Sequence, residues 1–201
     1  QSLLLEMQIC RSKPFMALLQ DKLIETFGQQ EAFTANNLYN HHIHVDKGLI
    51  RVDADELTYP LHIIMRYELE QKLISGQCEV DDLPELWHEQ MGSLFGLTTL
   101  SNDKDGVMQD VHWPSGAFGY FPAYTLGAIT AAQLAASMRA ELTTIDNKLD
   151  RDSFQAIKLW LGNNVHQYGA RYNFNDLMIK ATGKPLAVDN YLAHIEQRYL
   201  N

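Results

Sequence analysis

The chain has 201 residues, enough for a sizeable core, and its 46% hydrophobic and 20% charged residues are ordinary for a globular protein. Its formal net charge of −9 argues against a nucleic-acid-binding surface, which needs clustered lysine and arginine. No apolar run reaches the ~20 residues of a membrane-spanning helix, and no signal peptide is evident. We therefore expect one helical unit over 1–201, with neither nucleic acid nor a membrane as partner.

The first quarter of the chain predicts three helices. Residues 2–9 are rich in leucine and predict a mostly buried helix. Ser12 is the expected cap of a second helix that runs to about residue 27, and a glycine follows it. Thr34 is the expected cap of a short helix that ends near residue 42.

Two histidines could bind a metal, and two cysteines could form one disulfide. His41 and His44 stand three positions apart, a spacing at which two imidazoles could bind a metal. No Cys or Glu follows at ligand spacing, so solvated or core-edge histidines are the default, and a metalloenzyme built on this pair is an alternative. Cys10 and Cys78 predict free thiols in a reducing compartment, which favours a cytoplasmic protein.

The segment after these histidines is the one place where we expect extended structure. Residues 49–52 favour a very short strand, and strand signal is nearly absent elsewhere. A helix follows, and its start is ambiguous. If it begins at Asp55, Pro60 should kink it, whereas a cap at Thr58 places Pro60 in the first turn.

This helix carries an apolar stripe and charged residues at helical spacing. We expect Arg66 and Glu70 to form an i, i+4 ion pair on its outer face. The stripe that we expect inside consists of Leu57, Leu61, Ile64, Met65, Leu69 and Leu73.

Further helices are expected for the rest of the chain, which makes the fold class all-α. The expected helices begin near residues 82, 120, 151, 173 and 189, and each start has an Asp, Asn or Pro signal or an apolar stripe.

The region 106–136 joins a polar loop to a helix start. The loop concentrates Gln109, Asp110 and His112 ahead of a proline. The following helix places Tyr120 and Tyr124 on the face of an alanine stripe. Such an arrangement can bind an anionic or carbonyl group, and the alternative is a capped helix whose tyrosines pack in the core.

Four ordered motifs in this chain resemble the thermostable carboxypeptidase (carboxypeptidase Taq) family of zinc metallocarboxypeptidases. G-x-x-Q-D-x-H-W stands at 106–113 and G-Y-F-P-x-Y-x-L-G at 119–127. I-R-x-x-A-D stands at 50–55, and the opening QSLLLEMQICRS is similar to the segment that begins at the Gln of the family's H-E-S-Q motif. The resemblance covers essentially the whole chain.

The resemblance implies a C-terminal portion of a zincin-type, neurolysin-like fold that lacks its metal ligands. The family's zinc is held by an H-E-x-x-H helix and the Glu of H-E-S-Q. Here His88 and Glu89 are followed by Gln, Met and Gly, and the Glu would precede Gln1. We expect zinc in the intact enzyme and no metal ligand in this chain, which should be inactive alone.

The resemblance also implies removal of C-terminal amino acids from peptides, with distinct roles for residues of this chain. Arg51 is the expected partner of the substrate's free carboxylate, and a salt bridge to a nearby acid at 53, 55 or 56 is the alternative. His112, Tyr120 and Tyr124 are the expected catalytic donors to the oxyanion.

The remaining expectations concern positioning residues and partners. Gln109 and Asp110 belong to the substrate-binding group, where we expect them to orient His112 or its loop. The expected partners are peptide substrates, the N-terminal part of the same enzyme and a second copy in a homodimer. The alternative function is a non-catalytic helical module for interaction or structure.

Overall fold

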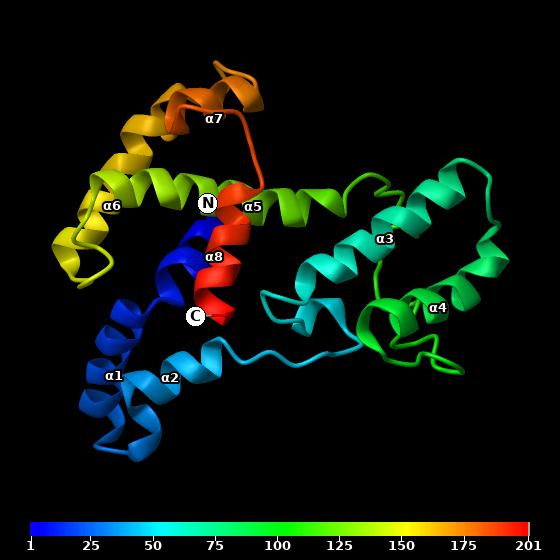
Figure 1. The fold of residues 1–201 in the computed structure, drawn as a ribbon, viewed down its shortest axis with the longest axis horizontal. Coiled ribbons are helices and arrows are strands. Elements are labelled where there is room, and N and C mark those ends of the chain that lie inside the picture. The colour runs from blue at the N-terminus through cyan, green and yellow to red at the C-terminus, as the bar shows by residue number, and fades with distance from the viewer. Residues whose placement is uncertain (201) are drawn as a thin grey trace. The chain divides into compact units, whose positions relative to one another are not determined.

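The computed structural model describes residues 1–200 and is built from helices and turns (Figure 1). No strand occurs among these residues, so the all-α prediction is confirmed. The short strand expected at 49–52 is wrong, because Arg51–Asp53 forms a 3-10 helix. None of the helices in residues 1–200 combines the length and apolarity needed to cross a bilayer. The α-helices are α1 (Lys13–Phe27), α2 (Ala35–His42), α3 (Tyr59–Ile74), α4 (Leu83–Phe95), α5 (Pro122–Glu141), α6 (Arg151–Asn164), α7 (Phe174–Thr182) and α8 (Asp189–Tyr199).

The internal contacts of the chain fall into two compact units. The first unit comprises Gln1–Ile43 and Gly127–Asn201, and the second comprises His44–Leu126. Helix α5 contributes its first residues to the second unit and the remainder to the first. The expectation of one helical unit over 1–201 stays a prediction.

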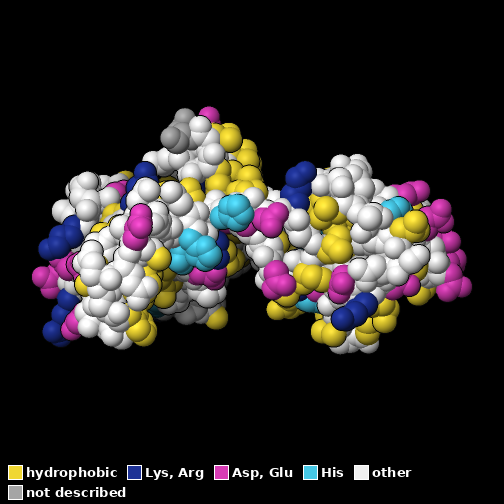
Figure 2. Space-filling model, turned by 90° about the horizontal axis from the view of Figure 1, so that it is seen from below, with side chains coloured by type: hydrophobic (Ala, Val, Ile, Leu, Met, Phe, Trp, Pro, Cys, Tyr) yellow, Lys and Arg dark blue, Asp and Glu magenta, His cyan; other side chains and the backbone are white. Residues whose placement is uncertain are grey.

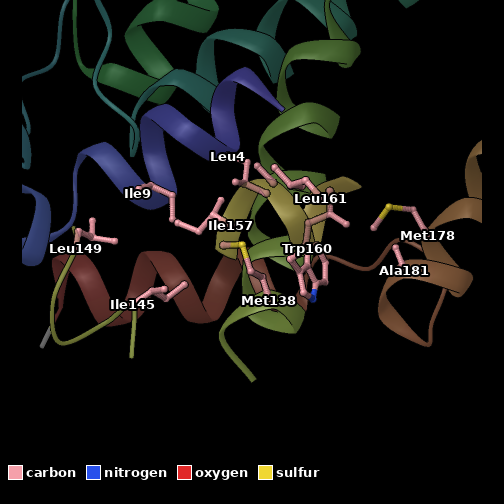
Figure 3. Close-up of a cluster of buried hydrophobic side chains, with 12 residues drawn as sticks. Leu4, Ile9, Met138, Ile145, Leu149, Ile157, Trp160, Leu161, Met178 and Ala181 are labelled. Carbon is pink, nitrogen blue, oxygen red and sulfur yellow. The ribbon is translucent and has the colours of Figure 1, made fainter. Parts of the chain in front are cut away.

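The core of the first unit gathers side chains from both ends of its sequence (Figure 3). The opening segment forms a π-helix, Leu4–Cys10, in which Leu4 and Ile9 are buried. The expectation of a mostly buried helix is met only in part, because Leu5 is 48% exposed. These residues pack with α5 and α6, so distant parts of the chain share one core. Its buried members are Leu4, Ile9, Ala131, Leu134, Met138, Ile145, Leu149, Ile157, Trp160, Leu161, Met178 and Ala181.

The helix starts predicted from capping residues are largely confirmed. The hydroxyl oxygens of Ser12 and Thr34 accept backbone N–H bonds at the starts of α1 and α2. The amide oxygen of Asn173 accepts the corresponding bond at α7. At α3, Thr58 is the cap position and Pro60 lies in the first turn, where its missing N–H costs nothing. The alternative in which Pro60 kinks the helix is therefore wrong.

A buried glutamine fixes the segment that follows α7. Gln133 of α5 is 0% exposed, and its amide NH₂ donates to the Thr182 hydroxyl at 2.8 Å and to the carbonyls of Lys184 and Pro185. Its Oε1 accepts from the Ala187 backbone N–H at 2.9 Å. One side chain thus satisfies several backbone groups that no regular helix could pair.

The second unit is built on α3 and α4, which pack against each other as a hairpin (Figure 1). Their buried residues are Met65, Leu69, Leu83, Trp87, Met91 and Phe95. Trp87, Met91 and Phe95 form the buried face of α4. The predicted stripe of α3 is wrong at Ile64, which is 43% exposed. The buried face of α3 includes the polar residues His62, Arg66 and Glu70 instead.

The surface carries charges of both signs. On the face shown in Figure 2, lysine and arginine side chains are scattered among acidic ones rather than gathered into a continuous basic patch. This distribution agrees with the net charge of −9.

Candidate functional site

A row of buried polar side chains on α3 is the foundation of the site. His62, Arg66 and Glu70 follow at four-residue intervals and therefore share one helix face. Their exposed fractions are 0%, 0% and 7%. The prediction that Arg66 and Glu70 pair on the outer face is wrong, because this face packs against the polar loop 105–121 and each side chain bonds to that loop.

Asp110 in this loop lies between two guanidinium groups. Arg51 donates from Nη2 to Asp110 Oδ1 at 2.7 Å and from Nε to the same oxygen at 3.1 Å. Arg66 donates from Nε to Oδ2 at 2.6 Å. The three side chains are at most 10% exposed. Two cations share one carboxylate, so the group carries one net positive charge away from bulk water.

Gln109 ties the same loop to the segment that precedes α3. Its Oε1 accepts from the backbone N–H of Arg51 and from Nη2 of Arg66, both at 2.8 Å. Its Nε2 donates to the carbonyls of Leu49 at 3.0 Å and Asp105 at 2.8 Å. A side-chain amide therefore pairs with backbone groups of Leu49 and Arg51, which lie about 60 residues away in the sequence.

The electrostatics keep the group of two arginines and one aspartate ionised. Burial lowers the pKa of Arg66 to about 10, which leaves it protonated at neutral pH. Burial also acts to lower the pKa of Arg51, but the hydrogen bond and charge of Asp110 outweigh it and raise that pKa. Burial would raise the pKa of Asp110, yet the bonds and charges of both arginines outweigh burial and lower it.

His112 and Tyr124 form a hydrogen-bonded pair beside this group. The Nε2 of His112 lies 2.9 Å from the Tyr124 hydroxyl, and its Nδ1 lies 3.6 Å from Asp110 Oδ1. Burial lowers the pKa of His112 and raises that of Tyr124. Both groups are therefore neutral near pH 7, and the pair can present one hydrogen, from the ring or from the phenol, to a third group.

Aromatic rings enclose the functional groups. The ring centroid of Tyr120 lies 5.5 Å from those of His112 and Tyr124, and Tyr120 is 51% exposed. The guanidinium of Arg51 lies 5.0 Å from the Tyr124 centroid and donates to the Tyr59 hydroxyl at 2.6 Å. Three of the five N–H groups of Arg51 are engaged by these contacts within residues 1–200.

Glu70 fixes the loop that leads to Tyr120. One carboxylate oxygen accepts from the indole Nε1 of Trp113 at 2.8 Å, and the other accepts from the backbone N–H of Gly119. Gly119 has φ of +73°, a conformation that favours glycine, so the backbone can turn its N–H toward Glu70. The two ends of the loop 113–119 are thus held by one side chain.

The structure brings five of the six site residues selected from the sequence into direct contact, and it places Tyr120 beside them. The five are Arg51, Gln109, Asp110, His112 and Tyr124. Arg51 pairs with Asp110 instead of with the acids at 53, 55 and 56 that we considered. Sequence reasoning missed Tyr59, Arg66 and Glu70. For the last two, the polar spacing of four residues on an otherwise apolar helix was a usable signal.

Metal binding does not fit the residues that the structure describes. Among residues 1–200, no group of three or more His, Cys, Asp or Glu side chains could hold an ion. His41 and His42 contact each other edge to face at 5.6 Å, and His42 Nδ1 bonds to the Leu38 carbonyl.

Comparisons with known proteins show which proteins this chain is similar to. Carboxypeptidase 1 of Bacillus subtilis is 41% identical over 202 residues, covering 100% of this chain and 40% of that protein. The structure of Trypanosoma cruzi metallocarboxypeptidase 1 matches with a TM-score of 0.94 and 44% identity, and the Pyrococcus furiosus carboxypeptidase structure with 0.93 and 32%. These matches cover 100% and 99% of this chain, but only 42% and 40% of the matched chains.

The chain thus spans about 40% of the length of its curated relatives that it matches in full. A family profile described as carboxypeptidase Taq (M32) metallopeptidase matches residues 1–199. The resemblance seen in the four sequence motifs is therefore confirmed. The chain belongs to the carboxypeptidase Taq (M32) family of metallopeptidases.

Proposed function

We propose that this chain is the C-terminal part of a zinc metallocarboxypeptidase and forms one wall of its peptide-binding cleft. The observation that carries the proposal is the group of Arg51, Arg66 and Asp110, whose surplus positive charge lies beside the pair of His112 and Tyr124. An exopeptidase needs a cation for the substrate's free carboxylate and neutral donors for the oxyanion, and this wall offers both.

In this proposal, Arg51 binds the C-terminal carboxylate of the peptide through its two remaining N–H groups. His112 and Tyr124 donate a hydrogen to the oxyanion of the scissile carbonyl, and the exposed Tyr120 adds a second phenol. Gln109 orients Arg51 by accepting a hydrogen bond from the backbone N–H of Arg51. The zinc of the intact enzyme is assigned to residues outside this chain, and it would supply the activated water.

The test of the carboxylate role uses the intact enzyme and two substrates, an N-blocked dipeptide and its C-terminal amide. Arg51→Ala should lower kcat/KM for the acid by about a hundredfold, since a lost charge-assisted hydrogen bond costs about 1.5–3 kcal/mol. The residual rate on the amide should change much less, and Arg51→Lys should recover part of the loss. Equal losses on the two substrates would refute the role.

The test of the oxyanion role uses Tyr124→Phe in the same enzyme. Loss of the phenol should lower kcat more than tenfold while the thermal stability is kept. Unchanged activity would mean that Tyr124 only packs in the core.

Two further parts of the proposal concern assembly. The isolated 201-residue chain should show no peptidase activity, with or without added zinc, and turnover by the purified chain would contradict this. The intact enzyme is proposed to be a homodimer, which light scattering coupled to size exclusion can test.

A further inference from the structure

Arg66 is a cation that no ligand can reach. It is 0% exposed, and its guanidinium lies 4.5 Å from the Trp87 ring centroid. Its Nε donates to Asp110, its Nη2 to Gln109 and its Nη1 to the carbonyl of His62. Arg66 can therefore influence a ligand only without touching it, through its charge and through the residues that it holds.

The two oxygens of the Asp110 carboxylate bond to different arginines, and this division indicates the role of Arg66. Both short bonds from Arg51, at 2.7 and 3.1 Å, end on Oδ1, while Oδ2 receives the 2.6 Å bond from Arg66 and only a 3.4 Å contact from Arg51. Arg51 is thereby kept from closing a symmetric two-oxygen fork with Asp110. Its charge stays only partly compensated.

Formal charge gives the same result. With Arg66, the two arginines and Asp110 sum to +1. Without Arg66, the pair of Arg51 and Asp110 would sum to zero and would lose its net attraction for an anion. In a site that is at most 10% exposed, one unit of charge is weakly screened.

We propose that Arg66 is a positioning residue which gives the Arg51 subsite its net positive charge and so makes it selective for a carboxylate over the neutral amide. This inference rests on the proposed carboxylate role of Arg51. It goes beyond that role because it assigns the selectivity to a residue that never touches the substrate.

The experiment measures binding to the 201-residue chain itself, with N-acetyl-phenylalanine as the probe and its amide as the neutral control. The ¹⁵N-edited NMR signal of the Arg51 Nε–H reports the contact, and the dissociation constant is taken from the titration. In the unaltered chain the acid should shift this signal and the amide should not.

Four variants separate a charge effect from a merely structural one. Arg66→Met should weaken binding of the acid about tenfold or more, and Arg66→Lys should stay close to the unaltered chain. Asp110→Asn should bind the acid more tightly than the unaltered chain, because the group then carries +2. The double variant Arg66→Met with Asp110→Asn returns the group to +1 and should regain most of the affinity lost by Arg66→Met alone.

The order of these affinities decides the matter. A structural role alone makes Asp110→Asn weaker than the unaltered chain and the double variant weakest, and that order would overturn the inference. If Arg66→Met does not fold, the comparison of Asp110→Asn with the unaltered chain still decides it. Arg171→Met, which removes an exposed arginine of the other unit, is the matched control.

The proposed function can fail separately. If the unaltered chain binds acid and amide equally, the carboxylate role of Arg51 is wrong. If it prefers the acid, and Arg66→Met keeps that preference within twofold, only the inference about Arg66 is wrong.

Discussion

Acid should destabilise the second unit through His62, a histidine buried between α3 and α4. Its side chain is 0% exposed, its ring centroid lies 4.4 Å from that of Phe95, and its Nδ1 lies 3.5 Å from Nη1 of Arg66. Burial first, and then the charges of Arg66 and Arg51, lower the pKa of His62 to about 4. The folded chain therefore keeps this imidazole neutral at pH values where an unfolded chain protonates it.

The size of the effect follows from the two pKa values. An unfolded histidine titrates near 6.5, and each tenfold change in proton affinity corresponds to about 1.4 kcal/mol, so His62 contributes up to about 3 kcal/mol. Between about pH 4 and pH 6.5 the unfolded chain binds the extra proton. The free energy of unfolding should therefore be highest above pH 6.5 and fall as the pH drops through this window.

The assay is urea unfolding followed by circular dichroism at half-unit steps from pH 4.5 to pH 7.5. His62→Gln removes the titrating group but keeps an acceptor for Arg66, and His44→Gln removes an exposed histidine of the same unit as control. The unaltered chain should lose stability relative to His62→Gln as the pH falls. Parallel profiles for these two proteins would refute the reasoning.

Three substitutions test the other anchoring contacts, each by the midpoint of urea unfolding. Gln133→Leu leaves the polar groups of 182–187 without their partner and should destabilise the chain by about 2–4 kcal/mol. An unchanged midpoint would mean that the bonds of Gln133 to this segment do not stabilise the fold. Gly106→Ala places a Cβ 2.9 Å from a backbone carbonyl and should cost about 1–3 kcal/mol, whereas an unchanged midpoint would mean that the backbone yields freely. Glu70→Gln removes one acceptor from the two N–H donors of 113–119 and should lower the free energy of unfolding by about 1–3 kcal/mol. It should also change the tryptophan fluorescence, whereas the control Glu68→Gln, on the exposed face of α3, should not.

The helices and their boundaries were largely predictable because their signals are local. A capping hydroxyl, as at Ser12 or Thr34, acts on N–H groups within three residues. The prediction failed at 49–52, where the Leu49 carbonyl and the Arg51 backbone N–H bond to the side chain of Gln109, about 60 residues away.

By itself, the sequence determined the helical class, most helix starts and, through four motifs, the family and five contacting residues of the candidate site. Only the tertiary structure decided that Arg66 and Glu70 turn inward and that Arg51 pairs with Asp110. From local spacing alone, Arg51 could have paired with any of three nearer acids. The same spacing predicted that Arg66 and Glu70 pair with each other. In the folded chain, Arg51 and Arg66 both pair with Asp110 instead. A buried charge is stable only when its partner is held beside it, and the loop that carries Asp110 comes from a distant part of the chain.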